Sequence, residues 1–174
     1  MDAIVEAALK KWPNVPHCYG WLALDARGDW YMRDDRIQRA GPFPQVKGSR
    51  IDHDKLLAFI GRNYAHDDAG CWFFQNGPQR VYVELEDTPW VWRLQPDGRV
   101  LSHTGAPAEV QSIWLDEGGR LYLATDLGAG LVHTADMALA AEAVEQGRWA
   151  PGELANADLP RRFGFVRRPA PAAA

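Results

Sequence analysis

The chain has 174 residues, of which 47% are apolar and 24% charged, with a formal net charge of −4. This length allows one domain or two small halves, and a chain of this size buries about 70% of its unfolded surface, so a core can form without disulfides or metals. The acidic balance argues against a nucleic-acid partner, and no stretch approaches the roughly 18 apolar residues of a membrane span.

Cysteine and histidine show no ligand pattern. Cys18 and Cys71 lie far apart without a CxxC motif, and the five histidines have no metal-ligand spacing. We therefore expect no metal and no cofactor. Free thiols favour a reducing cytoplasm, and residues 2–12 lack the features of a signal peptide.

The first half of the chain alternates helices with hairpin strands. Residues 2–12 have apolar side chains at helical spacing and predict a helix that Pro13 ends. Strands at 21–24 and 30–32 follow. Residues 33–50 predict a long irregular surface loop, because they contain a mixed charge cluster and Gly41-Pro42-Phe43-Pro44.

A second helix of about three turns is expected from Asp52, which has the chemistry of an N-cap. The remaining segments have the lengths and patterns of short strands and one more helix. Strands are predicted at 72–75, 80–87, 90–94, 99–103, 113–115, 121–125 and 163–166, and the helix from Thr134 or Asp136 to Glu145 or Gln146. The segment Gly128-Ala129-Gly130 predicts a turn, since it lacks the context of a phosphate-binding loop.

The pattern Asp-x-x-Gly followed by large apolar residues occurs three times. It begins at Asp25, Asp67 and Asp116, and a looser copy surrounds Asp97. Aspartate suits the first position of a type I turn and glycine the last, so the pattern predicts hairpin turns rather than calcium loops. It also suggests two similar halves.

Together these elements predict an α+β fold of antiparallel hairpins and sheets with about three helices. The expected organisation is an N-terminal half at 1–105, a C-terminal half at 106–168 packed on it, and a disordered tail at 169–174.

Residues 48–91 carry a family resemblance. Gly48-Ser49-Arg50-Ile51, then Leu56-Leu57, Gly70-x-Trp72-Phe73 and the run from Pro78 to Val91 with Glu86-Asp87-Thr88-Pro89-Trp90 resemble the proteobacterial domain of unknown function 1285. Arg50 and Gln79 depart from that family's proline and glutamate, which is compatible with a sister family. The resemblance implies an α+β fold with a repeated helix-plus-sheet motif, and suggests a regulatory or signalling role without an established activity.

The strand at 80–87 and its exit hold the candidate binding site. Its members are polar or aromatic residues on one side of the strand or at its end: Arg80, Tyr82, Glu84, Glu86, Asp87 and Trp90. The carboxylates could act as acid and base, or could be the solvated face of a strand. Arg80 could bind a carboxylate or phosphate or pair across the sheet, and Trp90 could be a ligand platform or core.

Three functions remain open. We expect a non-enzymatic protein that binds an unknown small molecule or protein, because aromatic residues are abundant and no catalytic motif is present. One alternative is a small hydrolase or isomerase using carboxylates of 80–87. The other is an interaction protein that forms a homodimer; neither nucleic acid nor a membrane is expected as partner.

Overall fold

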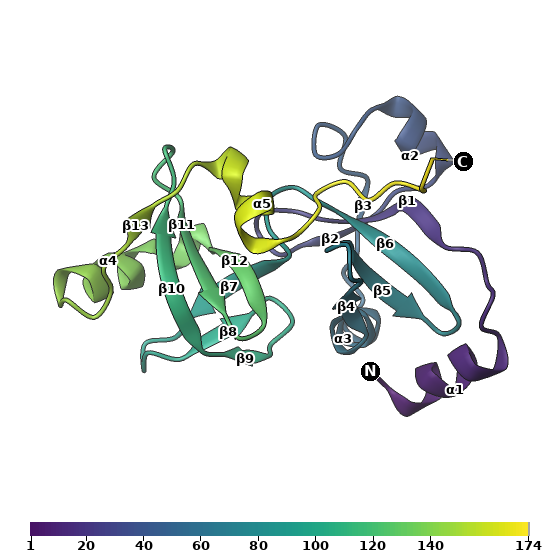
Figure 1. Cartoon of the computed structure of the whole chain (residues 1–174), viewed down its shortest axis with the longest axis horizontal. Helices are drawn as coiled ribbons and strands as arrows, with labels where there is room; N and C mark the ends of the chain where they lie inside the picture. The colour runs from purple at the N-terminus through teal and green to yellow at the C-terminus, as the bar shows by residue number, and fades with distance from the viewer. Residues whose placement is uncertain (174) are drawn as a thin grey trace. The chain divides into compact units, whose positions relative to one another are not determined.

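The computed structural model describes residues 1–173, which form two compact units (Figure 1). The first unit contains Met1–Asp25, Asp29–Glu86 and the chain from Phe165, and the second contains Ala26–Gly28 and Asp87–Gly164. The division after Glu86 lies earlier than the expected boundary after residue 105. The reason is that the strand Trp90–Leu94 pairs in parallel with a strand of the second unit.

The first unit is built on a six-stranded mixed sheet. Its elements are α1 (Ala3–Lys11), β1 (Cys18–Leu24), β2 (Trp30–Met32), α2 (Asp35–Ala40), β3 (Ser49–Arg50), α3 (Asp54–Arg62), β4 (Tyr64–His66), β5 (Trp72–Asn76) and β6 (Gln79–Leu85). The strand order is β3-β2-β1-β6-β5-β4, with β1 and β6 parallel and the other neighbours antiparallel. Helix α3 packs against β5, where Phe59 meets Phe74 edge to face at 5.5 Å.

The second unit is built on a seven-stranded mixed sheet. Its elements are β7 (Trp90–Leu94), β8 (Val100–Ser102), β9 (Pro107–Ala108), β10 (Val110–Leu115), β11 (Leu121–Thr125), β12 (Gly128–Val132), the 3-10 turn Thr134–Asp136, α4 (Met137–Glu145), β13 (Gly152–Glu153), the 3-10 turn Asn156–Asp158 and α5 (Leu159–Phe163). The order is β13-β10-β11-β12-β7-β8-β9, with β10–β13 and β12–β7 parallel.

The α+β class is confirmed, but the expectation of about three helices is wrong, since residues 1–173 contain five α-helices. The first additional helix, α2, lies inside the predicted loop 33–50, where Asp34 accepts the Ile37 backbone N–H at 2.9 Å and caps it. The second, α5, replaces the start of the strand predicted at 163–166. Phe43 is 1% exposed and anchors the 33–50 segment.

The turn predicted at Gly128–Gly130 is wrong, because these residues form β12 between β11 and β7. Gly130 has an ordinary backbone conformation. A Cβ atom there would overlap Nε1 of Trp92, so glycine is required by the close approach of an indole ring rather than by a turn.

The three Asp-x-x-Gly turns are confirmed and share one set of contacts. Asp25, Asp67 and Asp116 each accept the backbone N–H four residues later, at 2.9, 2.9 and 2.8 Å. Each also accepts a tyrosine hydroxyl: Tyr31 at 3.2 Å, Tyr82 at 2.8 Å and Tyr122 at 3.2 Å. The glycines have φ near +80°, as the motif predicts. No helix in the described chain is long and apolar enough to span a bilayer.

Candidate functional site

The strand β6 separates apolar from polar side chains, as its sequence predicts. Val81, Val83 and Leu85 are buried, whereas Arg80 and Glu84 keep partial exposure. The six candidate residues are divided between the two units: those from Arg80 to Glu86 belong to the first unit, and Asp87 and Trp90 belong to the second.

Arg80 and Tyr82 interact with each other on β6. The guanidinium carbon of Arg80 lies 3.8 Å from the ring centroid of Phe73, and its Nη1 donates to the Tyr82 hydroxyl at 3.3 Å. The Tyr82 hydroxyl donates to Asp67 at 2.8 Å, and its ring stacks on Tyr19 at 4.8 Å. These residues form an aromatic cluster capped by an arginine. The alternation of side chains along β6 predicts that Arg80 and Tyr82 share a face, but not their contacts with Phe73, Tyr19 and Asp67.

Tyr82 and Asp67 influence each other's pKa. Burial is the main cause that raises the pKa of Tyr82, and the Asp67 carboxylate raises it further while Arg80 opposes. Burial alone would raise the pKa of Asp67. The backbone N–H of Cys71, the Tyr82 hydroxyl and the Arg80 charge outweigh burial and lower it. Asp67 is therefore held as a carboxylate.

Glu84 and Glu86 have different partners, both supplied by the segment after β2. Glu84 lies 3.9 Å from the buried guanidinium of Arg33, which also donates to the carbonyl oxygens of Gly41 and Val46. These contacts hold the 33–48 segment in place and give Glu84 a structural partner.

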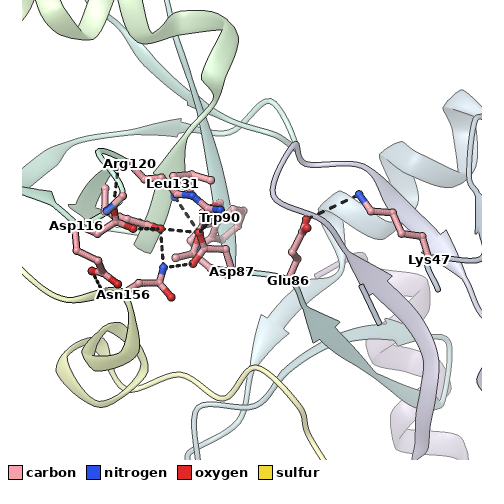
Figure 2. A network of polar contacts seen from close by, with 12 residues as sticks. Lys47, Glu86, Asp87, Trp90, Asp116, Arg120, Leu131 and Asn156 are labelled. Carbon is pink, nitrogen blue, oxygen red and sulfur yellow. Dashed lines mark hydrogen bonds and ion pairs between the residues drawn. The ribbon is translucent and has the colours of Figure 1, made fainter. Parts of the chain in front are cut away.

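Lys47 joins Glu86 to the first of the repeated turns. Its Nζ lies 2.9 Å from Asp25 and 4.0 Å from Glu86 (Figure 2). Burial would lower the pKa of Lys47, but the hydrogen bond and charge of Asp25, together with Glu86, raise it. The ammonium group therefore neutralises a carboxylate that is nearly inaccessible to solvent.

Asp87 belongs to a buried polar cluster of the second unit (Figure 2). Its carboxylate accepts hydrogen bonds from the Tyr122 hydroxyl at 2.6 Å, Arg120 at 3.0 Å and Asn156 at 3.2 Å. Asp116 is the second carboxylate near the Tyr122 hydroxyl. Burial, followed by the charge of Asp87, raises the pKa of Tyr122 far above its usual value, so this hydroxyl keeps its proton and donates.

Trp90 is part of the core of the second unit. It is 6% exposed, stacks on Trp92 at 5.9 Å and donates from Nε1 to the carbonyl oxygen of Leu127 at 2.9 Å. Its ring is therefore packed on all but a small part of its surface. Of the two roles left open for Trp90, core packing has the contacts that support it.

No pattern in the sequence predicts the cavity on the face of the first sheet opposite to Arg80 and Tyr82. It has a volume of about 260 Å³, and strands β1, β2, β5 and β6, helix α3 and Ile51 line it. Most lining residues are apolar: Trp21, Leu22, Met32, Ile51, Leu56, Ile60, Phe74 and Val81, with Cys18, Asn76 and Gln79 completing the wall. Burial raises the pKa of the Cys18 thiol, which keeps it neutral and weakly polar.

Two large apolar side chains of this cavity remain accessible to solvent. Trp21 is 41% exposed and Met32 is 53% exposed. By contrast, Ile51 and Ile60 are 8% and 1% exposed and form the deeper wall. A cavity with an apolar wall and accessible apolar residues at its edge has the composition of a small-molecule site. Within residues 1–173, no group of three or more acidic, histidine or cysteine residues is arranged to hold a metal ion.

Comparison with known proteins agrees with an α+β fold and defines the family. A family model named DUF2944 and described as "Protein of unknown function (DUF2946)" matches residues 1–170. The chain therefore belongs to this family. No curated protein matches the chain.

A solved structure confirms the resemblance inferred from residues 48–91. The crystal structure of a DUF1285 family protein from Silicibacter pomeroyi DSS-3 matches with a TM-score of 0.52 and 12% sequence identity. The match covers 82% of this chain and 84% of that chain. At this identity the likeness concerns the fold, and the separate family model fits the expectation of a sister family.

Proposed function

We propose that the protein is a non-enzymatic binding module whose first unit takes up a small apolar ligand in the cavity beside α3. The observation that carries the proposal is the apolar wall together with the exposed side chains of Trp21 and Met32. Covering such surface contributes roughly 25 cal/mol for each Å² removed from water. A ligand that shields these two residues from water therefore makes the free energy of binding more favourable.

The contacts of the carboxylates favour this proposal over the hydrolase or isomerase alternative. Glu84 forms an ion pair with Arg33, and Glu86 forms one with Lys47. Asp87 accepts hydrogen bonds from three donors within 3.2 Å. A general acid or base needs access to the substrate proton. We assign these three carboxylates, and Trp90 in the core, structural roles.

The sheet edges favour a binding module over a protein that dimerises through strand pairing. The edge strands β3, β9 and β13 have two residues each, and β4 has three. Short edge strands resist edge-to-edge association. We place the protein in a reducing compartment such as the cytoplasm, which suits its two free thiols at Cys18 and Cys71.

The proposal is tested with N-phenyl-1-naphthylamine, a neutral apolar fluorophore whose emission rises in apolar surroundings. The wild-type protein is expected to bind it saturably with 1:1 stoichiometry. Leu56→Trp, which places a larger side chain in the cavity wall, is expected to remove this binding. The matched control is Val144→Trp on α4, where the wild-type residue is 40% exposed and lies outside the cavity, and it should bind normally. Equal binding by L56W and the wild type, or no saturable binding, would exclude the cavity as the site.

A further inference from the structure

Arg80 has an environment that differs from that of the ion-paired arginines of the chain. Its guanidinium carbon lies 3.8 Å from the ring centroid of Phe73, well inside the roughly 6 Å limit of a cation–π contact. In residues 1–173, no carboxylate lies within ion-pair distance of it. The charge is therefore fixed in position without a direct counter-ion.

A chain of contacts holds this guanidinium in place. Nη1 of Arg80 donates to the Tyr82 hydroxyl, and that hydroxyl donates to Asp67. Asp67 is itself fixed by the backbone N–H groups of Ala69 and Cys71 at 3.0 and 2.9 Å. Since Tyr82 is 6% exposed, the anchor is buried whereas Arg80 is only half-buried.

The remaining N–H groups of Arg80 are available for a ligand. A guanidinium group presents its donors as a planar fork that matches the two oxygens of a carboxylate or phosphate. A separation of 3.8 Å from Phe73 is that of two stacked planes, and stacking uses the face of the group and leaves the donors at its edge. Because the side chain is already ordered, binding does not incur the usual entropy loss of fixing an arginine.

We propose that Arg80 is the anchor of an oxyanion site that binds a small soluble ligand through its carboxylate or phosphate group. Tyr19 and His17 flank the site through their contacts with the Tyr82 ring, at 4.8 Å and 5.6 Å. Asp67 is linked to Arg80 through the Tyr82 hydroxyl and attracts its charge without a direct ion pair. The site uses the face of β6 opposite to Val81, which lines the apolar cavity, so it is a second site that goes beyond the proposed function.

The test uses inorganic phosphate and acetate at constant ionic strength, with chloride as the reference ion. The Nε–Hε signal of Arg80 and the backbone amide signal of Tyr82 in a ¹⁵N-correlated spectrum are expected to shift saturably with an apparent Kd of about 1–10 mM, since one bidentate contact supplies little binding energy. The Tyr82 amide signal also reports on binding in variants that lack the Arg80 side chain. Arg80→Gln should weaken binding at least about tenfold. The control Arg99→Gln removes the same charge from a residue 68% exposed and paired with Asp97, and should not weaken it.

Arg80→Lys keeps the positive charge but loses the planar pair of donors, so it should bind phosphate less tightly than the wild type. It replaces R80Q in the test if R80Q does not fold. No saturable shift of Arg80, or equal affinity of R80K and the wild type, would overturn the site. Binding to phosphatidylglycerol vesicles that phosphate does not displace would overturn the assignment to a soluble ligand. Phosphate affinity of L56W should equal that of the wild type, which separates this test from that of the apolar cavity.

Discussion

Removal of the Tyr122 hydroxyl tests how the buried cluster around Asp87 stabilises the second unit. The hydroxyl donates to Asp87 at 2.6 Å and accepts from Asn156 at 2.9 Å, and the residue is 1% exposed. A hydrogen bond to a charged group contributes about 1.5–3 kcal/mol. In Tyr122→Phe, Asp87 keeps Arg120 and Asn156, so we expect the free energy of unfolding to fall by about 2 kcal/mol, which is roughly a 30-fold change in the folding equilibrium.

The assay is urea denaturation followed by circular dichroism, with hydrogen exchange of the β11 amides to report on the second unit alone. Tyr31→Phe is the matched control, because it removes a tyrosine–carboxylate hydrogen bond, to Asp25 at 3.2 Å, from a half-buried tyrosine. Asp25 keeps Lys47 at 2.9 Å, so this variant should lose only about 0.5–1 kcal/mol. A loss below about 0.5 kcal/mol in Y122F, or equal losses in both, would refute the reasoning.

Two further variants test other contacts of the second unit. Gly130→Ala should lower the free energy of unfolding by about 1–3 kcal/mol, because its Cβ would overlap Trp92, whereas Gly118→Ala, with no contact closer than 3.4 Å, should lower it less in the same thermal melt. Asp136→Asn removes a carboxylate whose pKa is lowered, first by the hydrogen bond from Arg93. A lowered pKa means that the carboxylate stabilises the protein above its unfolded pKa of about 3.9, so wild type and D136N should differ in urea midpoint at pH 7 and converge as the pH falls below about 4; a constant difference would contradict this.

Local chemistry was the predictable part of the fold. The turns at Asp25, Asp67 and Asp116 follow from the carboxylate and glycine within four residues, and they occur as expected. Helices α1 and α3 likewise follow from apolar spacing, and α4 was expected from Thr134 or Asp136 as candidate caps. Helix α2 was not found, because its exposed residues carry no apolar stripe and prolines follow it.

Long-range packing was not predictable. Gly130 reads as a loop residue in sequence, and only the position of Trp92 on a neighbouring strand explains it. The boundary between the two units, which lies between Glu86 and Asp87, also depends on long-range contacts. Two consecutive carboxylates take partners from segments distant in sequence, Lys47 for one and Tyr122 with Arg120 for the other.

The candidate site was predictable only where a single strand defines it. The alternation of β6 identified Arg80 and Tyr82 as neighbours on one face, which the hydrogen bond between them confirms. The apolar cavity arises because α3 packs against β5 and leaves part of the sheet near Trp21 and Met32 accessible. The residue pattern of a single strand does not predict how much of the sheet a helix covers.

The binding of an apolar ligand in the first unit is tested most directly by methyl NMR. The chain has three methionines, Met1, Met32 and Met137, and only Met32 lines the cavity. With ¹³C-methyl methionine labelling, N-phenyl-1-naphthylamine should shift the Met32 signal saturably and give it intermolecular NOEs, while the other two signals stay in place. Saturable binding that leaves Met32 unchanged, or that shifts Met1 or Met137 instead, would contradict the proposed function.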